Sequence, residues 1–395
     1  MVVTMDQEQR AGRETLMKYL AEVPDPRKAR GKRYEWQFLL GIICAALVSG
    51  QKSVRGIAEW AVLHAKELLE ELKPAKGRIP SPSTLYRALR RLDIKALESQ
   101  IADYGQAIDQ EDQAAGEVIG PHGQSWRGQA VDGKVVRGAS AHGEQVHLVS
   151  LVRHESATVM GQVRVDQNTN EIRAVPVLLE GRDLKGTVTT MDALLTHKPL
   201  AEAIFESGGG QYLMVVKRNQ PEMYRAIKFL FDSPPLPPDE EDRLSYSYSG
   251  KGHGRIETRT LESSALLGEY LDWPGANQVL RRTCRCIKIN TGEIREETTY
   301  GITSLSREQA LPRQLEAFWR AHWTIENKVH YVRDETLGED RCQVRVNNGP
   351  QALAALRNGI LSMLRFEGWH YIPRALRFYG ASVPRALRII GAHAT

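Results

Sequence analysis

The sequence predicts an α/β protein in which a mixed β-sheet follows an all-helical N-terminal region. Apolar residues recur at helical spacing through roughly the first hundred residues, as in "WQFLLGIICAALVSG". Beyond residue 125 the pattern changes to three strands, and then to helices and strands in alternation. That alternation is typical of a sheet that is covered by helices and whose later strands are parallel.

Residues 1–110 are the predicted helical region, and they contain two informative helices. The most apolar run, 38–48, is shorter than the ~20 residues of a membrane-spanning helix, so we expect a buried core helix and no membrane segment. A second helix begins near Pro82 in "IPSPSTLYRALRRLD", after a Ser or Thr cap. Its exposed face resembles the groove-entering helix of a helix-turn-helix, although a short basic helix in solvent is an equal alternative; that face carries Arg87, Arg90 and Arg91.

The remaining chain divides into four predicted parts. Residues 125–220 form the first part of the sheet-containing core, from "GQAVDGKVVRGA" to "QYLMVVKRN". Residues 221–310 form a β-rich insertion, which opens with the turn-rich linker "SPPLPPDEED" and continues with strands that alternate as antiparallel strands do. Residues 311–366 return to the core with the helix "HWTIENKVHYVRDE" and the helices after it, and residues 367–395 form a basic tail.

Charge is distributed unevenly along the chain. The formal net charge is +5, yet residues 341–395 contain eight Arg, no Lys and one acid. Clustered basic charge indicates a polyanionic partner such as nucleic acid, with a solvated basic face as the alternative. The tail also holds a short repeat, "PRALRFYG" and "PRALRIIG", whose two copies are too few for a solenoid and could be accidental.

Cysteine usage indicates a reducing compartment. Four cysteines in 395 residues do not make a disulfide framework, and no secretory signal precedes an apolar stretch at the start. We therefore expect a cytoplasmic protein.

Three carboxylates stand in settings that suggest chemistry. Asp132 lies inside a predicted buried strand, Asp192 ends the strand "GTVTTMD", and Glu326 lies on the later helix. Buried acids need a partner or a cation, and carboxylates from three separate elements make an oxygen site suited to Mg²⁺ or Mn²⁺. Two such ions ~4 Å apart can activate a water or a 3′-hydroxyl and stabilise the leaving oxygen at a phosphodiester. Singly, each acid has a structural alternative as a helix cap or an ion-pair partner.

The Glu326 helix carries an unusual mixture of groups on one predicted face. At a 3.6-residue period that face contains Trp319, His322, Trp323, Glu326, His330 and Arg333. Since buried charge is costly unless it is paired or bound to a metal, this face predicts a charged site, with the two tryptophans seating the helix on the sheet.

Several other polar residues are weaker candidates. Lys217, Asn219 and Gln220 follow the last core strand, where they could reach DNA or order a metal ligand, and where a polar turn is an equal explanation. His253 and Arg255 are predicted to alternate with Glu257 on one face of a strand, which favours a phosphate-binding ribbon over a solvated hairpin. Glu339 and Asp340 are predicted to support the site or to pair with the Arg-rich tail.

The motifs together resemble the H-repeat-associated (ISAs-type) insertion-sequence transposases of the DDE class. The resemblance covers the whole chain, in order: "EVPDPRKARGKRY", "GIAEWA", "PSPSTLYRALRRLD", "QAVDGKVVRGA", "NEIRAVPVLLE", "GTVTTMDAL", "YLMVVKRNQP", "GHGRIETR" and "HWTIENKVHYVRDETLGED". It implies an RNase H-like catalytic core whose metal-binding triad is Asp132, Asp192 and Glu326, with two Mg²⁺ ions that Mn²⁺ can replace. Related transposases carry Tyr-x2-Arg-x3-Glu-x6-Lys on this helix. Arg333 keeps the phosphate-binding cation, and His322, which replaces the usual Arg, is the second expected DNA contact of the helix.

The resemblance implies a DNA transposase that cleaves at the terminal inverted repeats of an insertion sequence and transfers the freed 3′-hydroxyl to target DNA. A homodimer on DNA is expected because two ends are joined, in the bacterial cytoplasm at the nucleoid. The alternatives are a metal-dependent DNA nuclease without strand transfer and a DNA-binding remnant without catalysis. The intact Asp, Asp and Glu set argues against the remnant.

Overall fold

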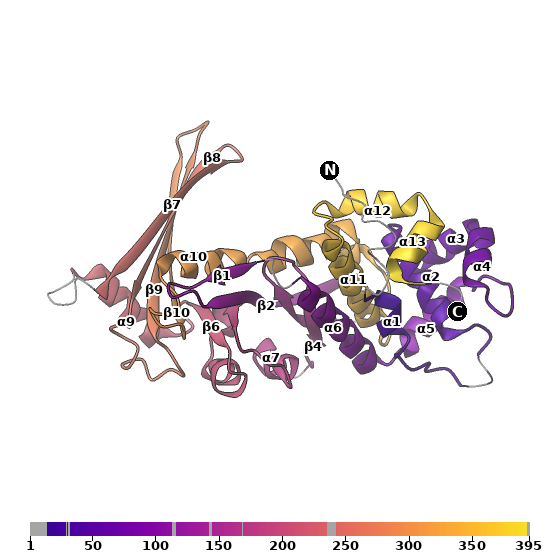
Figure 1. Cartoon of the computed structure of the whole chain (residues 1–395), viewed down its shortest axis with the longest axis horizontal. Coiled ribbons are helices and arrows are strands. Elements are labelled where there is room, and N and C mark those ends of the chain that lie inside the picture. The colour runs from indigo at the N-terminus through magenta and orange to yellow at the C-terminus, as the bar shows by residue number, and fades with distance from the viewer. Residues whose placement is uncertain are drawn as a thin grey trace. The chain divides into compact units, whose positions relative to one another are not determined.

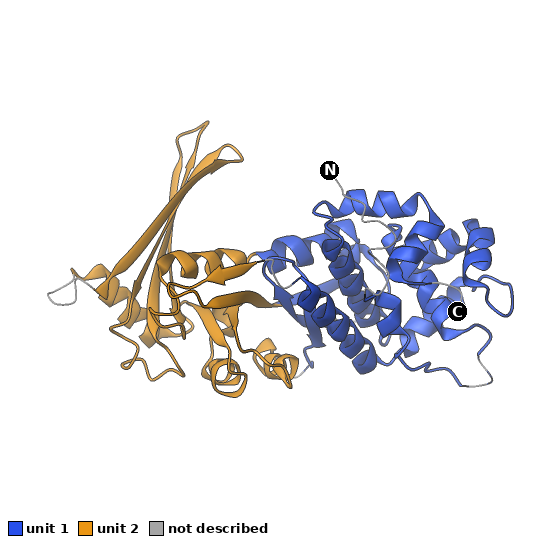
Figure 2. Cartoon of the chain, viewed as in Figure 1, with its two compact units in different colours: residues 1–115, 133–169, 324–395 blue, residues 116–132, 170–323 orange. Residues whose placement is uncertain are grey.

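The computed structural model describes residues 14–28, 30, 32–112, 116–141, 144–167, 169–234 and 242–392 (Figure 1). The chain divides into two compact units (Figure 2). Unit 1 comprises residues 1–115, 133–169 and 324–395, and unit 2 comprises residues 116–132 and 170–323. The predicted linker spans residues 233–242, and its residues 235–241 lie outside the described residues.

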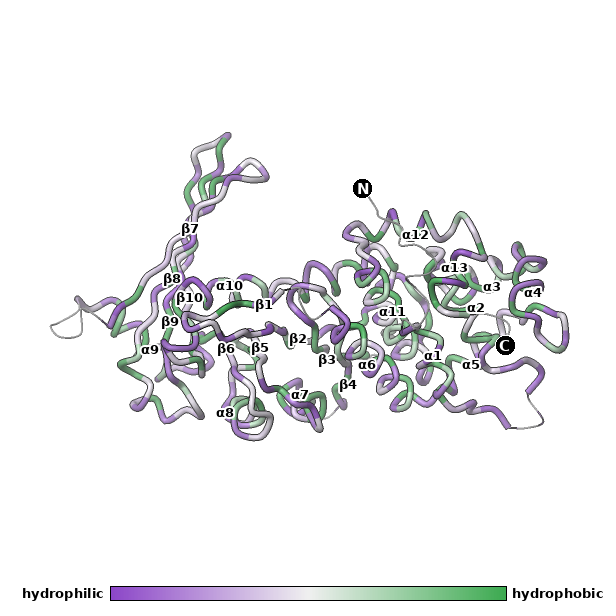
Figure 3. The backbone as a smooth tube through the Cα atoms, viewed as in Figure 1, coloured by the Kyte–Doolittle hydropathy of each residue, from purple (hydrophilic) through white to green (hydrophobic). Residues whose placement is uncertain are grey.

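Helices from both ends of the chain build most of unit 1, which confirms the helical N-terminal region. The central helix is α2, in which every residue except Gln37 is buried and which appears hydrophobic in Figure 3. No described helix is long and apolar enough to cross a membrane. The helices are α1 (Leu16–Leu20), α2 (Trp36–Val48), α3 (Val54–Leu63), α4 (Ala65–Leu72), α5 (Pro82–Arg91), α6 (Ile94–Glu111), α11 (Gly349–Phe366), α12 (Ile372–Gly380) and α13 (Val383–Ile390).

The strands of the described residues form one sheet of ten strands, and this sheet is mixed, as the sequence predicted. Its order is β4-β3-β2-β5-β6-β10-β9-β8-β7, with β1 paired to β2. The β2–β5 and β5–β6 pairs are parallel, so the later core strands are parallel as expected. The bounds are β1 (Glu117–Ile119), β2 (Ser125–Ala141), β3 (Glu144–Arg153), β4 (Val159–Arg164), β5 (Thr187–Met191), β6 (Gln211–Val216), β7 (Leu244–Gly252), β8 (Arg255–Ser264), β9 (Gln278–Lys288) and β10 (Ile294–Thr303).

Strand β2 contributes to both units, because the division between them falls after Asp132. In unit 2, residues 127–131 of β2 pair with β5. In unit 1, Val136 and Ala139 of the same strand pack into an apolar cluster with residues of β3 and with Ala354 of α11. The long strand is therefore a covalent element common to both units.

The insertion is antiparallel, as predicted, and it also extends the core sheet. Strands β7, β8, β9 and β10 pair in sequence, and β10 then pairs with β6 of the core, where Tyr300 stands opposite Val216. The β7–β8 hairpin closes through His253 and Gly254, both at positive φ (49° and 72°). Two such residues in a two-residue loop are typical of a type I′ turn, whose twist matches that of the strands.

The remaining helical segments belong to unit 2, except the last three. They are α7 (Glu171–Leu179), η3 (Ala193–Leu195), α8 (Lys198–Glu202), η4 (Ala203–Ser207), α9 (Pro221–Asp232) and α10 (Pro312–Ala321) in unit 2, and η6 (Ile325–His330), η7 (Val332–Thr336) and η8 (Glu339–Arg341) in unit 1. Both η6 and η7 are π-helical. In η6 the N–H of Tyr331 donates to the carbonyl of Glu326, five residues earlier.

The π-helical geometry breaks the single face that a 3.6-residue period predicted for this stretch. Trp319 is buried and packs in the unit 2 core with Phe318 and Leu315, which confirms that it seats α10 on the sheet. Trp323 is 57% exposed, so the same prediction is wrong for Trp323.

Gly301 of β10 gives the tryptophan its space. A Cβ atom added at Gly301 would lie 2.7 Å from the Trp319 ring and 3.0 Å from the Met214 carbonyl oxygen. We therefore predict that Gly301→Ala destabilises unit 2 by about 1–3 kcal/mol, because the indole must shift out of a packed core.

The measurement is thermal unfolding followed by tryptophan fluorescence. Gly252→Ala is the matched control, since a Cβ atom there meets nothing within 4 Å. Equal midpoints for Gly301→Ala and the control would contradict this account of the Trp319 seat.

Candidate active site

Two of the three predicted carboxylates are neighbours in unit 2. Val131 of β2 pairs with Met191 of β5 in parallel register. Asp132 and Asp192 are the next residues on these two strands, whose backbones are about 5 Å apart in a sheet. Asp132 is half-buried. The sequence predicted that Asp192 ends its strand. The strand register shows in addition that Asp132 and Asp192 each directly follow a residue of the same strand pair, Val131 and Met191.

The loop after Asp192 is held by side chains from the end of β6. Asp192 Oδ1 accepts a hydrogen bond from the Leu194 amide at 2.9 Å, which caps η3. The Asn219 amide donates to the Ala193 carbonyl at 2.6 Å, and the Gln220 amide donates to the Thr196 carbonyl at 2.9 Å. Asn219 was predicted to reach DNA, to order a metal ligand or to belong to a polar turn. These contacts fit the second alternative, because its amide holds the loop that follows Asp192.

His322 reaches the same strand in unit 2. Its Nδ1 lies 2.9 Å from the hydroxyl oxygen of Thr190, which itself donates to the Gln129 carbonyl at 3.2 Å. Thr190 and Asp192 are two residues apart and so belong to one side of the extended chain. His322 thus links the end of α10 to the strand that leads to Asp192.

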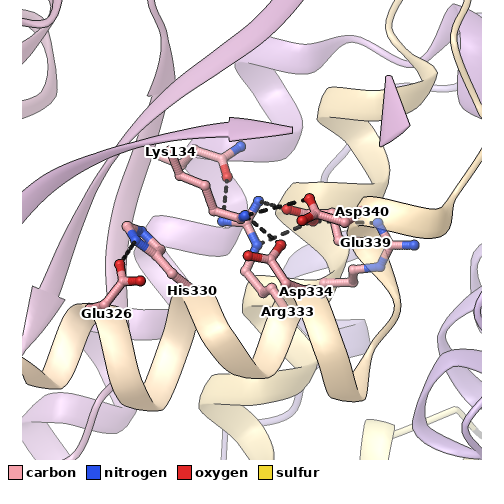
Figure 4. A network of polar contacts seen from close by, with 9 residues as sticks. Lys134, Glu326, His330, Arg333, Asp334, Glu339 and Asp340 are labelled. Atoms are coloured by element: carbon pink, nitrogen blue, oxygen red, sulfur yellow. Dashed lines mark hydrogen bonds and ion pairs between the residues drawn. The ribbon is translucent and has the colours of Figure 1, made fainter. Parts of the chain in front are cut away.

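In unit 1, Glu326 is paired with His330 one turn further along the helix (Figure 4). His330 Nδ1 lies 3.3 Å from Glu326 Oε2, and the imidazole is buried whereas the carboxylate side chain is 54% exposed. This hydrogen bond lowers the pKa of the Glu326 carboxyl, and burial lowers the pKa of His330. An ionised Glu326 can only accept, so the neutral imidazole donates from Nδ1.

A lysine of β2 faces the same helical stretch in unit 1. The Lys134 ammonium contacts Asp334 and lies 3.9 Å from Asp340 (Figure 4). Its side chain is only 6% exposed, so these carboxylates supply the counter-charge that a buried ammonium needs. Lys134 also lowers the pKa of Glu326, after the larger effect of His330. Sequence reasoning did not assign Lys134; a lone lysine two residues after Asp132 in an apolar strand was the available signal.

Arg333 is fully buried, with 0% of its side chain exposed. Its guanidinium donates to Glu339 at 2.7 and 3.2 Å, and Arg357 contacts the same carboxylate at 3.4 Å. Although burial alone raises the pKa of Glu339, the two guanidinium groups hold it below its ordinary value. This position contradicts the prediction that Arg333 contacts a DNA phosphate, and it agrees with the prediction that Glu339 pairs with the Arg-rich C-terminal segment.

The buried network continues to Glu98 of α6. Gln162 of β4 and Gln351 of α11 donate to the same Glu98 oxygen at 2.8 and 2.9 Å. Gln162 also accepts from Asn358 at 2.9 Å. Burial raises the pKa of Glu98 to about 7, because the amides only partly replace lost water.

The other predicted DNA contacts lie in varied positions. Arg87 and Arg91 of α5 are exposed, whereas Arg90 is half-buried with its guanidinium over the Tyr86 ring. Lys217, His253 and Arg255 are all exposed. His253 lies in the hairpin turn, so its predicted place on one strand face with Arg255 is wrong: β8 begins only at Arg255.

The chain is similar to proteins of a known family. The family described as "Transposase DDE domain" matches residues 124–363, and the family described as "DDE_Tnp_1-associated" matches residues 17–104. "Putative transposase YncI" of Escherichia coli O157:H7 is 26% identical over 359 residues, which cover 89% of this chain and 87% of the relative. "H repeat-associated putative transposase YhhI" of E. coli strain K12 is 26% identical, with 88% and 90% covered. "H repeat-associated putative transposase YbfD" of strain K12 is 30% identical, with 62% and 91% covered.

The Glu98 cluster predicts a specific pH dependence. A carboxyl whose folded pKa is raised stabilises the fold fully below its unfolded pKa of 4.5, and this contribution is lost as pH rises through about 7. The loss amounts to roughly 3 kcal/mol between pH 4.5 and 8. Glu98→Gln keeps an oxygen that can accept from both amides, so it should match the wild type near pH 5 and unfold at a higher temperature at pH 8.

The measurement is the difference in unfolding midpoint between variant and wild type across that pH range. Asp103→Asn is the control, because Asp103 is an exposed carboxylate on the same helix. A difference that does not change with pH, or that Asp103→Asn reproduces, would contradict the burial account.

Proposed function

Because the chain belongs to the DDE transposase family, we propose that it cleaves and joins DNA strands at a divalent-metal site formed by Asp132, Asp192 and Glu326. The family match confirms the resemblance read from the motifs, and the family implies DNA as the substrate. The observation that carries the proposal is the parallel pairing of Val131 with Met191, which puts Asp132 and Asp192 at one level on neighbouring strands.

The resemblance read from the motifs supplies Glu326 as the third member, and the contacts within unit 1 are consistent with that role. The Glu326 side chain is 54% exposed, and buried His330 lies 3.3 Å from its carboxylate. In the same unit Lys134 also lowers the pKa of the Glu326 carboxyl, after the larger effect of His330.

The donor set fits a hard divalent cation. Three carboxylates offer oxygen ligands of the kind that Mg²⁺ and Mn²⁺ prefer. Glu326 is ionised, since the His330 hydrogen bond lowers the pKa of its carboxyl. When bound, such ions lower the pKa of water and stabilise charge on the leaving oxygen.

The side chains around the carboxylates have distinct proposed tasks. Neutral His330 orients the Glu326 carboxylate by donating from Nδ1, and Asn219 fixes the loop that presents Asp192. We propose that exposed Lys and Arg side chains bind the DNA backbone by charge: Lys217 after β6, Arg255 at the hairpin, and Arg87 with Arg91 on α5. His253 in the hairpin turn is a proposed hydrogen-bonding contact. His322 positions strand β5 through Thr190 rather than contacting phosphate.

The proposed reaction is hydrolysis at the ends of a mobile element followed by attack of the freed 3′-hydroxyl on target DNA. In the first step water attacks phosphorus, and the 3′-oxygen leaves and takes up a proton. In the second step the freed 3′-hydroxyl loses its proton and attacks a phosphorus of the target strand, whose own 3′-oxygen leaves as a hydroxyl. Terminal inverted repeats as the bound ends, and a homodimer that holds two of them, are part of this proposal.

Glu326→Gln should abolish strand cleavage while DNA affinity stays within about twofold. Removing one ligand oxygen charge removes several kcal/mol of transition-state stabilisation, a loss on the order of 10³-fold or more in rate. The measurement uses Mg²⁺ and a plasmid that carries the gene with its native flanking DNA, with cleaved and joined products separated on a gel.

Glu335→Gln is the matched control, because Glu335 is an exposed carboxylate nearby that pairs with Arg341 at 3.5 Å. The control should cleave like the wild type. Cleavage without joined products would favour the nuclease alternative, and wild-type cleavage by Glu326→Gln would disprove the assignment of Glu326.

A further inference from the structure

The short repeat in the C-terminal segment is a structural repeat. "PRALR" occurs at residues 373–377 and again at 384–388, within α12 and α13. Equivalent positions have the same burial: Ala375 and Leu376 are buried in α12, as Ala386 and Leu387 are in α13. The eleven-residue offset in the sequence therefore corresponds to two helices that present matching faces.

The outer face of each helix carries two arginines. All four are exposed, and they are Arg374, Arg377, Arg385 and Arg388. Among the described residues, no ion pair includes any of these four side chains. Residues 368–395 contain no acidic residue at all, so this surface has no negative charge of its own.

The two helices are joined at their arginine faces. Arg385 of α13 donates to the carbonyl of Phe378 in α12 at 3.0 Å, and its guanidinium lies 4.0 Å from the centre of the Phe378 ring. The four arginines therefore lie on two helices that contact each other directly. We name these four side chains the PRALR surface.

The inner face of both helices is fixed in the core of unit 1. Both α12 and α13 contact the buried helix α2. Helix α13 also contacts α4, whose acids are Glu67, Glu70 and Glu71. Glu67 pairs with His64, the residue before the helix, at 2.8 Å, and Glu70 lies 4.0 Å from Lys66. The PRALR surface is thus a basic face on a rigid support.

We propose that the PRALR surface binds the phosphate backbone of duplex DNA outside the proposed catalytic site. Two residues three positions apart on a helix rise about 4.5 Å, comparable with the ~3.4 Å axial spacing of phosphates along one strand. Guanidinium groups match phosphate oxygens in geometry as well as in charge. The surface would hold DNA without reading its sequence, because phosphate contacts carry no base information.

This proposal rests on DNA as the substrate of the family, but it does not depend on the proposed metal ligands. The chain's other exposed cations provide a matched comparison, since unit 2 carries Arg173, Lys185, Arg225 and Arg313, all exposed and none assigned to DNA. Changing either set of four to Gln removes the same charge from the whole protein.

The experiment measures the affinity of the full-length protein for a fluorescent duplex of arbitrary sequence between ~50 and 200 mM salt. Each lost phosphate contact should make the slope of log K against log salt shallower by about 0.9. We expect the slope to become shallower by about 1.8 or more, the equivalent of two lost phosphate contacts, in the variant that combines Arg374→Gln, Arg377→Gln, Arg385→Gln and Arg388→Gln. The slope should stay at the wild-type value when the same four residues are changed to Lys.

A smaller change, or an equal change in the unit 2 control, would overturn the proposal. So would a loss of binding to anionic lipid vesicles with the DNA slope unchanged, since that would assign the surface to a membrane. Circular dichroism shows whether the variants remain folded. The slope is measured without cleavage, so it holds or fails independently of the Glu326→Gln result.

Discussion

The cost of burying charge is the constraint on which the architecture of unit 1 depends. Glu339 is completely buried, and it is tolerable there because Arg333 and Arg357 converge on its carboxylate. Those two arginines come from η7 and α11, so the ion pairs tie the helical stretch after Glu326 to the long core helix. Lys134 adds a second buried charge, which ties β2 to the same stretch through Asp334.

This framework explains how a half-exposed carboxylate can be held in a defined place. Glu326 lies on a helical stretch whose far end is fixed by Arg333, and its own carboxylate is oriented by buried His330. The charged residues of the stretch that was predicted to face DNA thus have two different roles. Arg333 supports the structure from inside, whereas Glu326 faces outward and is the member available for chemistry.

The sequence allowed the mixed sheet, the parallel core strands and the setting of Asp192 to be predicted, because each depends on local periodicity. It did not reveal that β10 would pair with β6, since strand pairing over that separation leaves no local signal. Arg333 was assigned to DNA from the spacing of the family motif, and that spacing does not reveal that the guanidinium is buried against Glu339. The sequence alone also does not distinguish an arginine that binds a phosphate from one that pairs with a buried carboxylate such as Glu339.

The central claim is that Asp132, Asp192 and Glu326 hold divalent metal together. Crystals of the full-length protein grown with Mn²⁺, with diffraction measured at the manganese absorption edge, test it most directly. The account predicts an anomalous peak within coordination distance of all three carboxylates, lost in Asp192→Asn crystals. A peak at other residues, or no peak at a Mn²⁺ concentration that supports DNA cleavage, would contradict it.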